Sequence, residues 1–260
     1  MGALDAVQES DLGGGFRFDP RGTRHGVIEA EPLTTVGFQA LMSPAGVNAR
    51  AQSEFSAWAE EAVSVGASRL RGVDQVHGAA VVRAESLRDG GRVEADGIIT
   101  RSPQDVAVIM AADCAPVWIA DPANGAVTLV HAGWRGVVAG VVEAGVLSLD
   151  VERSNRARIV AAIGPHLQTC CFEVGPEVAV QFQGHTRPAS TLLVGRRRGD
   201  SVALDLASAI RARLATQGVN SVHIAHACTR CRADILHSYR RNGKGGPLMG
   251  AIAVTASGSF

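Results

Sequence analysis

The sequence predicts one α/β (or α+β) domain in which a mixed β-sheet is flanked by helices. Short apolar runs of strand length, rich in valine and isoleucine, recur along the chain, and helical patterns lie between several of them without strict alternation. With 260 residues, of which 46% are hydrophobic, the chain can form a substantial core, and no segment has the composition of a linker between domains. We therefore expect a loose N-terminal tail over residues 1–15 and a single domain over residues 16–260.

Composition narrows the classes of partner. The formal net charge is zero, which is untypical of proteins that bind nucleic acid or anionic membranes, and aromatic residues, at 4%, are too scarce for a platform that stacks single-stranded bases. No apolar run approaches the roughly 20 residues needed to span a bilayer, and the N-terminus lacks the pattern of a signal peptide. Five cysteines fit a reduced compartment better than a disulfide scaffold. We expect a cytoplasmic protein without nucleic-acid or membrane partners.

The N-terminal half is predicted to hold one helix and several strands. Residues 16–26 are interpreted as a basic loop near glycines, in which an arginine could hold an anion such as phosphate or could simply be solvated. Residues 30–50 show no assignable pattern, whereas residues 54–66 have the pattern of an amphipathic helix that ends at Gly66. The expected strands lie on either side of residues 75–78, at the end of residues 95–100, and over residues 106–110, 117–120 and 127–130.

The C-terminal half is predicted to alternate helices and strands. A long apolar helix is expected over residues 136–150, a second begins at Pro176, and a third covers residues 205–218. The expected strands lie over residues 158–163, 219–225 and 249–254.

Three residues are candidate metal ligands. His131 follows the apolar run 127–130, and the end of a buried strand is where α/β folds place chemistry. His77, in the string Q-V-H-G, and Cys114, in A-D-C-A-P before an expected proline turn, precede it in similar surroundings. Their spacings of 37 and 17 residues are unlike the close ligand pairs of zinc fingers, whereas catalytic zinc sites draw ligands from distant segments. We expect the three to converge on zinc, with one position open for water or substrate.

Two of these residues also have a plainer interpretation. Taken alone, His77 fits a hydrogen-bonded loop histidine better than a ligand, and a buried Cys114 could be inert packing. A metal-free enzyme is also open, with Cys114 as the nucleophile and His131 or His77 as its base, and sequence spacing does not separate it from a zinc site. In a metal site, Asp96 or Asp113 could orient a ligand imidazole.

The other four cysteines are not interpreted as functional residues. Cys170 and Cys171 are adjacent, and adjacent cysteines do not readily bind one tetrahedral ion, so we expect them to pack in the interior. Cys228 and Cys231 form a C-x-x-C string, but no second such pair lies nearby in the sequence to complete a zinc site. Whether these two cysteines ever pair with each other is left open.

Six strings, in this order along the chain, resemble a known family. They are Q-V-H-G (75–78), A-D-G-I-I-T (95–100), A-D-C-A-P (112–116), H-A-G-W-R-G (131–136), I-G-P-H-L-Q-T-C-C-F-E-V-G (163–175) and S-Y-R-R (238–241). Together they resemble the laccase-domain family, also called the YfiH or polyphenol-oxidase-like family, from about Thr23 to the C-terminus. The combination of H-A-G-W-R-G with the D-C pair is highly specific.

The resemblance implies a single cytoplasmic α/β domain that binds zinc, with copper as the alternative ion, through His77, Cys114 and His131. It implies purine nucleoside phosphorylase activity on adenosine, inosine, guanosine and methylthioadenosine, together with adenosine deamination. The partners implied are therefore purine nucleosides and phosphate, and we expect a monomer or a homodimer.

The resemblance also implies where the substrate is bound. Arg24 matches the arginine of a family T-R-x-G-G-V segment, so it is expected to contact phosphate or substrate, and Arg135 and Arg240 are further candidates for that role. Residues 30–50 keep only Asn48 and Arg50 of the family pattern, so substrate contacts from this side are expected to differ.

Two other functions stay open at this point. A copper polyphenol oxidase is disfavoured, because four-copper oxidases need many paired histidines and the chain has eight histidines without an H-x-H pair. The other is a cysteine hydrolase that edits peptidoglycan precursors in the cytoplasm, using Cys114 without a metal.

Overall fold

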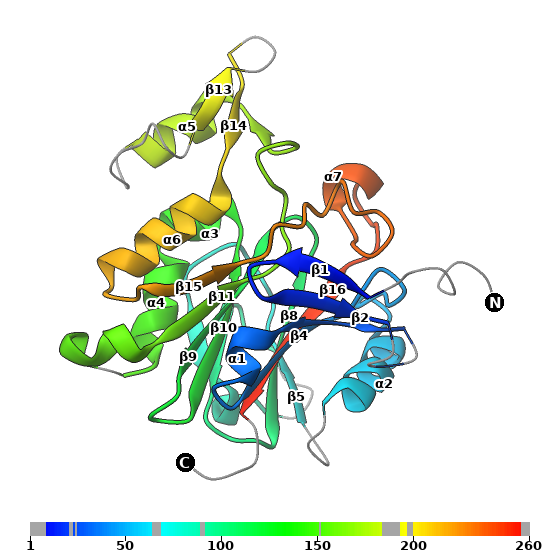
Figure 1. The fold of residues 1–260 in the computed structure, drawn as a ribbon, viewed down its shortest axis with the longest axis vertical. Coiled ribbons are helices and arrows are strands. Elements are labelled where there is room, and N and C mark those ends of the chain that lie inside the picture. Colours follow the sequence, from blue (N-terminus) through cyan, green and yellow to red (C-terminus); the bar gives the residue numbers. More distant parts are fainter. Residues whose placement is uncertain are drawn as a thin grey trace.

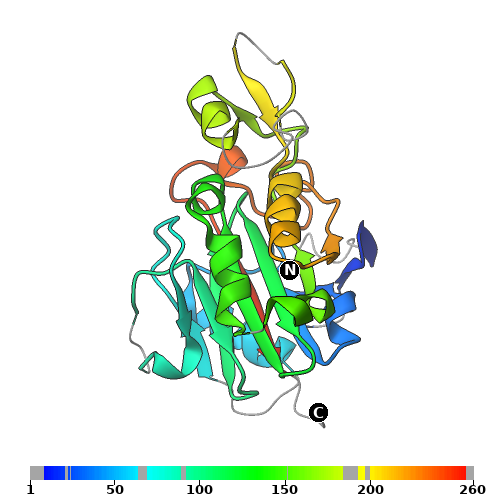
Figure 2. The ribbon, with the colours of Figure 1, turned by 90° about the vertical axis from the view of Figure 1, so that its left-hand side faces the viewer.

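Two large β-sheets packed face to face make up most of the molecule in this computed structural model (Figures 1 and 2). The structure describes residues 9–20, 23, 25–63, 69–88, 92–150, 152–183, 193–196 and 200–255. Helices cover the outer face of each large sheet, so the layers run helix, sheet, sheet, helix. The α/β class with mixed sheets is confirmed, although the strands divide among several sheets where one was expected.

The seven-stranded sheet is antiparallel except where β5 runs parallel to β8. Its strands, in spatial order, are β1 (Ser10–Gly13), β2 (Phe16–Asp19), β3 (Val27–Ala30), β4 (Phe38–Met42), β16 (Met249–Thr255), β8 (Asp105–Ala111) and β5 (Arg69–Gly72). The single-turn helix α1 (Glu31–Thr34) joins β3 to β4. The helix α2 (Gln52–Ala62) covers the outer face, where its Phe55 and Trp58 share a buried cluster with Val106 of β8.

The six-stranded sheet contains two parallel pairs, β11 with β15 and β6 with β7, and is otherwise antiparallel. Its strands, in spatial order, are β15 (Ser221–Ile224), β11 (Val160–Ile163), β9 (Ala115–Asp121), β10 (Ala126–Ala132), β7 (Gly97–Thr100) and β6 (Val81–Arg83). Its outer face is covered by α3 (Trp134–Ala139), α4 (Val141–Ser148) and α6 (Leu206–Thr216). Two 3-10 turns, Ala84–Ser86 and Arg153–Arg158, follow β6 and precede β11.

A third, small sheet extends from one end of the molecule, at the top of Figure 1. It consists of β12 (Glu173–Val174), β14 (Val202–Leu204) and β13 (Leu193–Arg196), with α5 (Pro176–Gln183) beside it. The last short helix, α7 (Tyr239–Asn242), precedes β16. None of the helices in the described part of the chain has the length and hydropathy of a membrane-spanning segment.

The apolar central strands are buried on both faces. Along β9, Val117 and Ile119 lie in the cluster beneath the helices, whereas Trp118 and Ala120 lie in the cluster between the two sheets, because successive side chains of a strand alternate. The Trp118 indole also donates a hydrogen bond of 2.9 Å to the carbonyl of Ile252 in the opposing sheet. Burial on both faces explains why these strands read as continuous apolar runs in the sequence.

Two N-terminal predictions are wrong in part. The tail expected over residues 1–15 is not loose throughout, because Ser10–Gly13 form β1 and pair with β2. Residues 1–8 lie outside the described residues. The basic loop expected over residues 16–26 begins instead with strand β2 (Phe16–Asp19), whose two phenylalanines are buried.

Three further boundaries differ from expectation. The helix predicted over residues 136–150 is two helices, because Gly140 adopts a left-handed conformation (φ 96°) that interrupts it. Pro116 was expected in a turn but lies near the start of β9. Helix α2 ends at Ala62, and the predicted stop at Gly66 falls outside the described residues.

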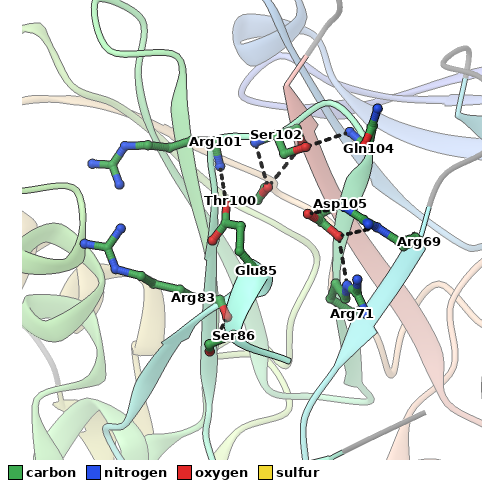
Figure 3. A network of polar contacts seen from close by, with 10 residues as sticks. All are labelled: Arg69, Arg71, Arg83, Glu85, Ser86, Thr100, Arg101, Ser102, Gln104 and Asp105. Atoms are coloured by element: carbon green, nitrogen blue, oxygen red, sulfur yellow. Dashed lines mark hydrogen bonds and ion pairs between the residues drawn. The ribbon is translucent and has the colours of Figure 1, made fainter. Parts of the chain in front are cut away.

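A buried carboxylate attaches the edge strand β5 to β8. The side chain of Asp105 is 1% exposed and accepts hydrogen bonds from Arg69 (Nε at 3.0 Å, Nη2 at 3.1 Å) and from Nε of Arg71 at 2.8 Å (Figure 3). Both arginines come from β5, so a single acidic residue holds the parallel edge of the sheet.

We expect Asp105→Ala to lower the free energy of unfolding by about 3 kcal/mol, because it leaves the 7%-exposed Arg71 guanidinium without this carboxylate. Urea unfolding followed by circular dichroism measures the loss. The matched control is Arg69→Met, which removes a partner that is 49% exposed and should cost less than about 1 kcal/mol. Equal losses in the two variants would contradict the assignment of a buried ion pair.

Candidate active site

His77, Cys114 and His131 lie together, although they come from three separate segments. His77 lies between β5 and β6, Cys114 lies between β8 and β9, and His131 lies near the end of β10. Because β9 and β10 are antiparallel neighbours in which His131 opposes Pro116, the segment just before Pro116 brings Cys114 beside the end of β10. The candidate donor atoms, one on each side chain, all lie within 4.8 Å of one another.

The distances between these side chains suit one small ion. Sγ of Cys114 lies 3.9 Å from Nε2 of His77, and the two imidazole rings meet edge to face with centroids 4.8 Å apart. Nitrogen and sulfur ligands of one tetrahedral zinc ion are about 3.6 Å apart, given zinc–ligand distances of about 2.0 and 2.3 Å. Two imidazoles and one thiolate with a fourth position open are a donor set of catalytic zinc sites. The residues present therefore fit such an ion.

One buried carboxylate organises this part of the molecule. Asp96 accepts hydrogen bonds from the backbone amides of Val76 (3.2 Å), His77 (3.0 Å) and Gly78 (2.6 Å). Its Oδ1 also lies 2.8 Å from Nδ1 of His131. Because Asp96 engages Nδ1, the other ring nitrogen of His131 is the one available to a metal. The same amide bonds hold His77 at a φ of 60°, which is uncommon for a residue other than glycine.

Gly133 leaves the space that the three ligands need. A Cβ atom at this position would lie 2.8 Å from Sγ of Cys114 and 3.1 Å from Cδ2 of His77. Both distances are shorter than ordinary van der Waals contact, so any larger residue would displace the two side chains. The glycine of the H-A-G-W-R-G string is thus explained by close approach of the backbone to the site.

The electrostatics of the site favour a thiolate. Burial raises the pKa of Cys114, but the charge of His131 and hydrogen bonds with both histidines outweigh burial and lower that pKa to about 6. Burial lowers the pKa of His131, while the Cys114 thiolate and the hydrogen bond to Asp96 raise it to about 9. Burial also raises the pKa of Asp96, yet its hydrogen bonds to His131 and the Gly78 amide bring it below the ordinary range. A thiolate is the form that either a metal or a nucleophilic mechanism requires.

A cavity of about 780 Å³ adjoins the three ligands. Its apolar wall is formed by Val73, Met110, Trp134, Leu167, Phe172, Leu206 and Leu248. Its polar lining includes four arginines, Arg50, Arg92, Arg135 and Arg240, against two carboxylates, Asp74 and Asp113. The cavity therefore combines apolar surface with more arginines than carboxylates, which suits a ligand that has both an apolar part and an anionic group.

The four arginines are not equally available to a ligand. Arg92 pairs with Asp74 at 2.7 Å, and Nε of Arg50 donates to the carbonyl of Gly246 at 2.8 Å. Arg135 lies over the Trp134 ring, with Cζ 4.3 Å from the ring centroid. The Arg240 guanidinium makes long contacts, of 3.4 and 3.5 Å, to the carbonyl of Glu173, and its Cζ lies 5.9 Å from the centroid of the Phe172 ring. Arg135 and Arg240 are thus the better placed to bind an incoming anion.

Two further predicted site residues are Asp113 and Arg24. Asp113 does not contact a ligand imidazole in the described structure; its carboxylate instead accepts hydrogen bonds of 2.6 Å from Thr229 Oγ1 and from the backbone amide of Arg240. It therefore fixes the position of Arg240 at the cavity. Arg24 lies outside the described residues.

Sequence analysis missed several residues of this site. Arg50 was recognised only as a residue of the family pattern, and Gln75 only as the first residue of the Q-V-H-G string, without a role of its own. Nothing in the local sequence around Arg92 distinguishes it from a surface residue. Gln75 holds β8 in register beside the cavity through two hydrogen bonds with the backbone of Met110, at 2.8 and 2.7 Å. The four remaining cysteines also differ from expectation: they lie together, and two of them are exposed.

Comparisons with known proteins identify the relatives of this chain. A family model described as multi-copper polyphenol oxidoreductase laccase matches residues 23–255. A purine nucleoside phosphorylase of Bacteroides thetaiotaomicron is 35% identical over 61% of this chain, and the match spans 60% of that protein. Adenosine deaminase RL5, from an unknown prokaryotic organism, is 34% identical over 57% of each chain.

The fold is also that of a solved structure. The crystal structure of the hypothetical protein YfiH of Bacillus licheniformis superposes with a TM-score of 0.79 at 19% identity, covering 92% of this chain and 98% of that one. With a family model that matches nearly the whole chain and this shared fold, the protein belongs to the laccase-domain (YfiH-type) family described as multi-copper polyphenol oxidoreductase laccase.

Proposed function

We propose that the protein is a zinc-dependent purine nucleoside phosphorylase that also deaminates adenosine. The observation that carries the proposal is the convergence of His77, Cys114 and His131 beside a cavity with an apolar wall and arginines. The names of two relatives, a purine nucleoside phosphorylase and an adenosine deaminase, supply the substrate class. Adenosine, inosine, guanosine and methylthioadenosine are the proposed substrates.

The residues of the cavity divide between the two substrates. The guanidinium groups of Arg135 and Arg240 would bind phosphate by charge-assisted hydrogen bonds. The purine would lie against the apolar wall, where Trp134 and Phe172 offer aromatic surface. Holding both substrates in one cavity lets a phosphate oxygen attack C1′ of the ribose while the bond from C1′ to the purine breaks, so the base leaves with the bonding electron pair and takes up a proton.

The metal site would sit at the edge of this cavity. A zinc ion held by His77, Cys114 and His131 would supply Lewis-acid polarisation of a substrate atom. Asp96 keeps Nδ1 of His131 engaged and so orients the ring toward the open side of the site. In deamination the second substrate is water instead of phosphate, and it reacts at a different carbon. Water adds at C6 of adenosine, ammonia leaves, and inosine is formed.

A specific observation supports one competing function. The lowered pKa of Cys114, about 6, beside a protonated His131 also suits a metal-free cysteine nucleophile, as a cysteine hydrolase of peptidoglycan precursors would need. Copper oxidation of phenols has less support, because neither group of candidate metal ligands in the described residues contains more than two histidines. Removal of the metal distinguishes the zinc-dependent phosphorylase from the metal-free cysteine hydrolase.

The proposed function is tested with purified protein, adenosine and chromatography of the products, with and without phosphate. We expect one zinc ion per chain at this site, adenine release that requires phosphate, and an inosine peak that does not. Removal of zinc with a chelator should abolish both products, and added zinc should restore them. Amidase activity that survives complete metal removal, without nucleoside turnover, would contradict the proposal and favour the cysteine hydrolase.

A further inference from the structure

Four cysteines that play no part in the proposed active site form a cluster of their own. Sγ of Cys231 lies 3.5 Å from Sγ of Cys171 and 3.8 Å from Sγ of Cys170. The sulfur atoms of these three and of Cys228 all lie within 4.8 Å of one another. Cys170 and Cys231 are exposed, Cys171 is half-buried and Cys228 is buried, so the cluster is not a packed apolar interior.

The topology of the six-stranded sheet brings these segments together. Strands β11 and β15 are parallel neighbours, so the loops that follow them leave the same edge of the sheet. The loop after β11 carries Cys170 and Cys171, and the loop after β15 carries Cys228 and Cys231. The two loops are joined by a β-bridge between His166 and Cys228.

Tight turns direct the sulfur atoms inward from both loops. The amide of Cys171 donates to the carbonyl of Gln168 at 2.8 Å, and this turn allows two adjacent cysteines to face one point. The amide of Cys231 donates to the carbonyl of Cys228 at 3.1 Å, which closes the C-x-x-C turn. Two adjacent cysteines can therefore bind the same metal ion, contrary to the expectation from the sequence.

The spacing of the sulfur atoms is that of a tetrahedral metal–thiolate site. With zinc–sulfur bonds of about 2.3 Å, tetrahedral geometry places sulfur atoms about 3.8 Å apart. Two of the six sulfur–sulfur separations are 3.5 and 3.8 Å, close to this value, and the other four are no longer than 4.8 Å. A four-sulfur tetrahedral set is typical of zinc or iron–sulfur centres, and a mononuclear site needs no more room than the cluster provides.

The surroundings of the cluster also suit an anionic metal–thiolate group. The Arg241 guanidinium donates hydrogen bonds of 2.9 Å to the carbonyls of Thr229 and Arg230, the two residues between Cys228 and Cys231. Burial raises the pKa of Cys228, but backbone amides, above all that of Gln168 in the other loop, bring this pKa below its ordinary value. Such donors stabilise thiolate ligands in the same way as they stabilise other buried anions.

We propose that Cys170, Cys171, Cys228 and Cys231 form a second, structural metal site that binds one zinc-class divalent ion. The ion would join two loops that form part of the cavity wall. Phe172, next to Cys171, lines the cavity, and Thr229, inside the C-x-x-C turn, holds the carboxylate of Asp113 at 2.6 Å. The site is closed by four protein ligands and stabilises the cavity wall, without taking part in the chemistry.

Metal content of variants tests the second site independently of any activity. Protein expressed with zinc and purified under reducing conditions is analysed by elemental mass spectrometry. We expect two zinc ions per chain in the wild type, one in Cys231→Ser, one in Cys114→Ser and none in the double variant. Because Cys231 and Cys170 are exposed, Cys170→Ser serves as a second single variant whose folding is checked by circular dichroism.

Cobalt(II) provides a second readout on the same proteins. In Cys114→Ser, cobalt should give the intense thiolate-to-metal absorption of a four-sulfur site, and that absorption should disappear in the double variant. The wild type and Cys231→Ser containing equal zinc would overturn the proposal. Iron in place of zinc at this cluster would also overturn it. A third contrary result is a disulfide between the two loops whose reduction does not change the zinc content of the protein.

Discussion

Replacing Cys114 with serine is expected to lower phosphate-dependent release of adenine from adenosine by more than about 100-fold. Loss of a residue that only orients a metal ligand typically costs 10–100-fold, so loss of a ligand itself should cost more. Serine keeps the size of the side chain but is not ionised at neutral pH, so the negative charge facing His131 is also lost. Steady-state rates at saturating adenosine and phosphate measure the effect, with unfolding curves to show that the variant is folded.

A pair of histidine variants separates the two explanations of that loss. If Cys114 binds a metal, His77→Ala and His131→Ala should each lose the active-site zinc ion and the activity, because each removes one of its three ligands. If Cys114 is a metal-free nucleophile, only the histidine that serves as its base is indispensable. Retention of most activity in one of the two variants, with no zinc in the wild type, would contradict the metal site.

The candidate metal site could be predicted because its residues lie at recognisable positions along the chain. Cys114 directly precedes β9, and His131 is the second-last residue of β10. Both strands are fully buried, and their apolar runs are visible in the sequence as buried strands. Their convergence follows from antiparallel pairing of sequence neighbours. The sequence predicts the position of His77 less directly. Its loop is held by the carboxylate of Asp96, which lies 18 to 20 residues further along the chain, and such a contact leaves no periodic pattern in the sequence.

The cysteine cluster could not be predicted in the same way. Cys170 and Cys231 are 61 residues apart, and they meet only because β11 and β15 are parallel neighbours in the sheet. Parallel pairing depends on the whole crossover between the strands, and a local search for ligand pairs does not detect it. The same non-local packing explains why residues 30–50, without an assignable pattern, contain β4, which pairs with the C-terminal strand β16.

The division of the strands between two sheets could not be predicted from the sequence either. β8 and β9 both appear as apolar runs, yet β8 belongs to the seven-stranded sheet and β9 to the six-stranded sheet. A strand buried on both faces gives no sign of which neighbour lies on which side, because both faces are apolar. The short connection between them, which contains Cys114, is thus also the place where the chain crosses from one sheet to the other.

Asp96→Asn is expected to lower zinc affinity by about 10–100-fold, the usual cost of removing the carboxylate that orients a ligand histidine. The amide has nearly the same shape, but its NH₂ group replaces one carboxylate oxygen and cannot accept the two hydrogen bonds that this oxygen receives. Either the pair from His131 and the His77 amide or the pair from the Val76 and Gly78 amides is lost. An unsatisfied donor in this buried place should also cost about 1–3 kcal/mol of the free energy of unfolding. Competition with a zinc-binding dye measures the affinity, and urea unfolding measures the stability.

The matched control is Asp113→Asn. Asp113 adjoins Cys114 in the chain and also accepts two short hydrogen bonds, from Thr229 and from the Arg240 amide, but it does not contact His131 in the described structure. We therefore expect Asp113→Asn to lower the stability and the affinity for phosphate while leaving the affinity for zinc at the active site within about threefold of the wild type, because the carboxylate bonded to the His131 imidazole is that of Asp96. Equal losses of zinc affinity in the two variants would show that general loosening of the cavity, and not the bond from Asp96 to His131, controls the metal site.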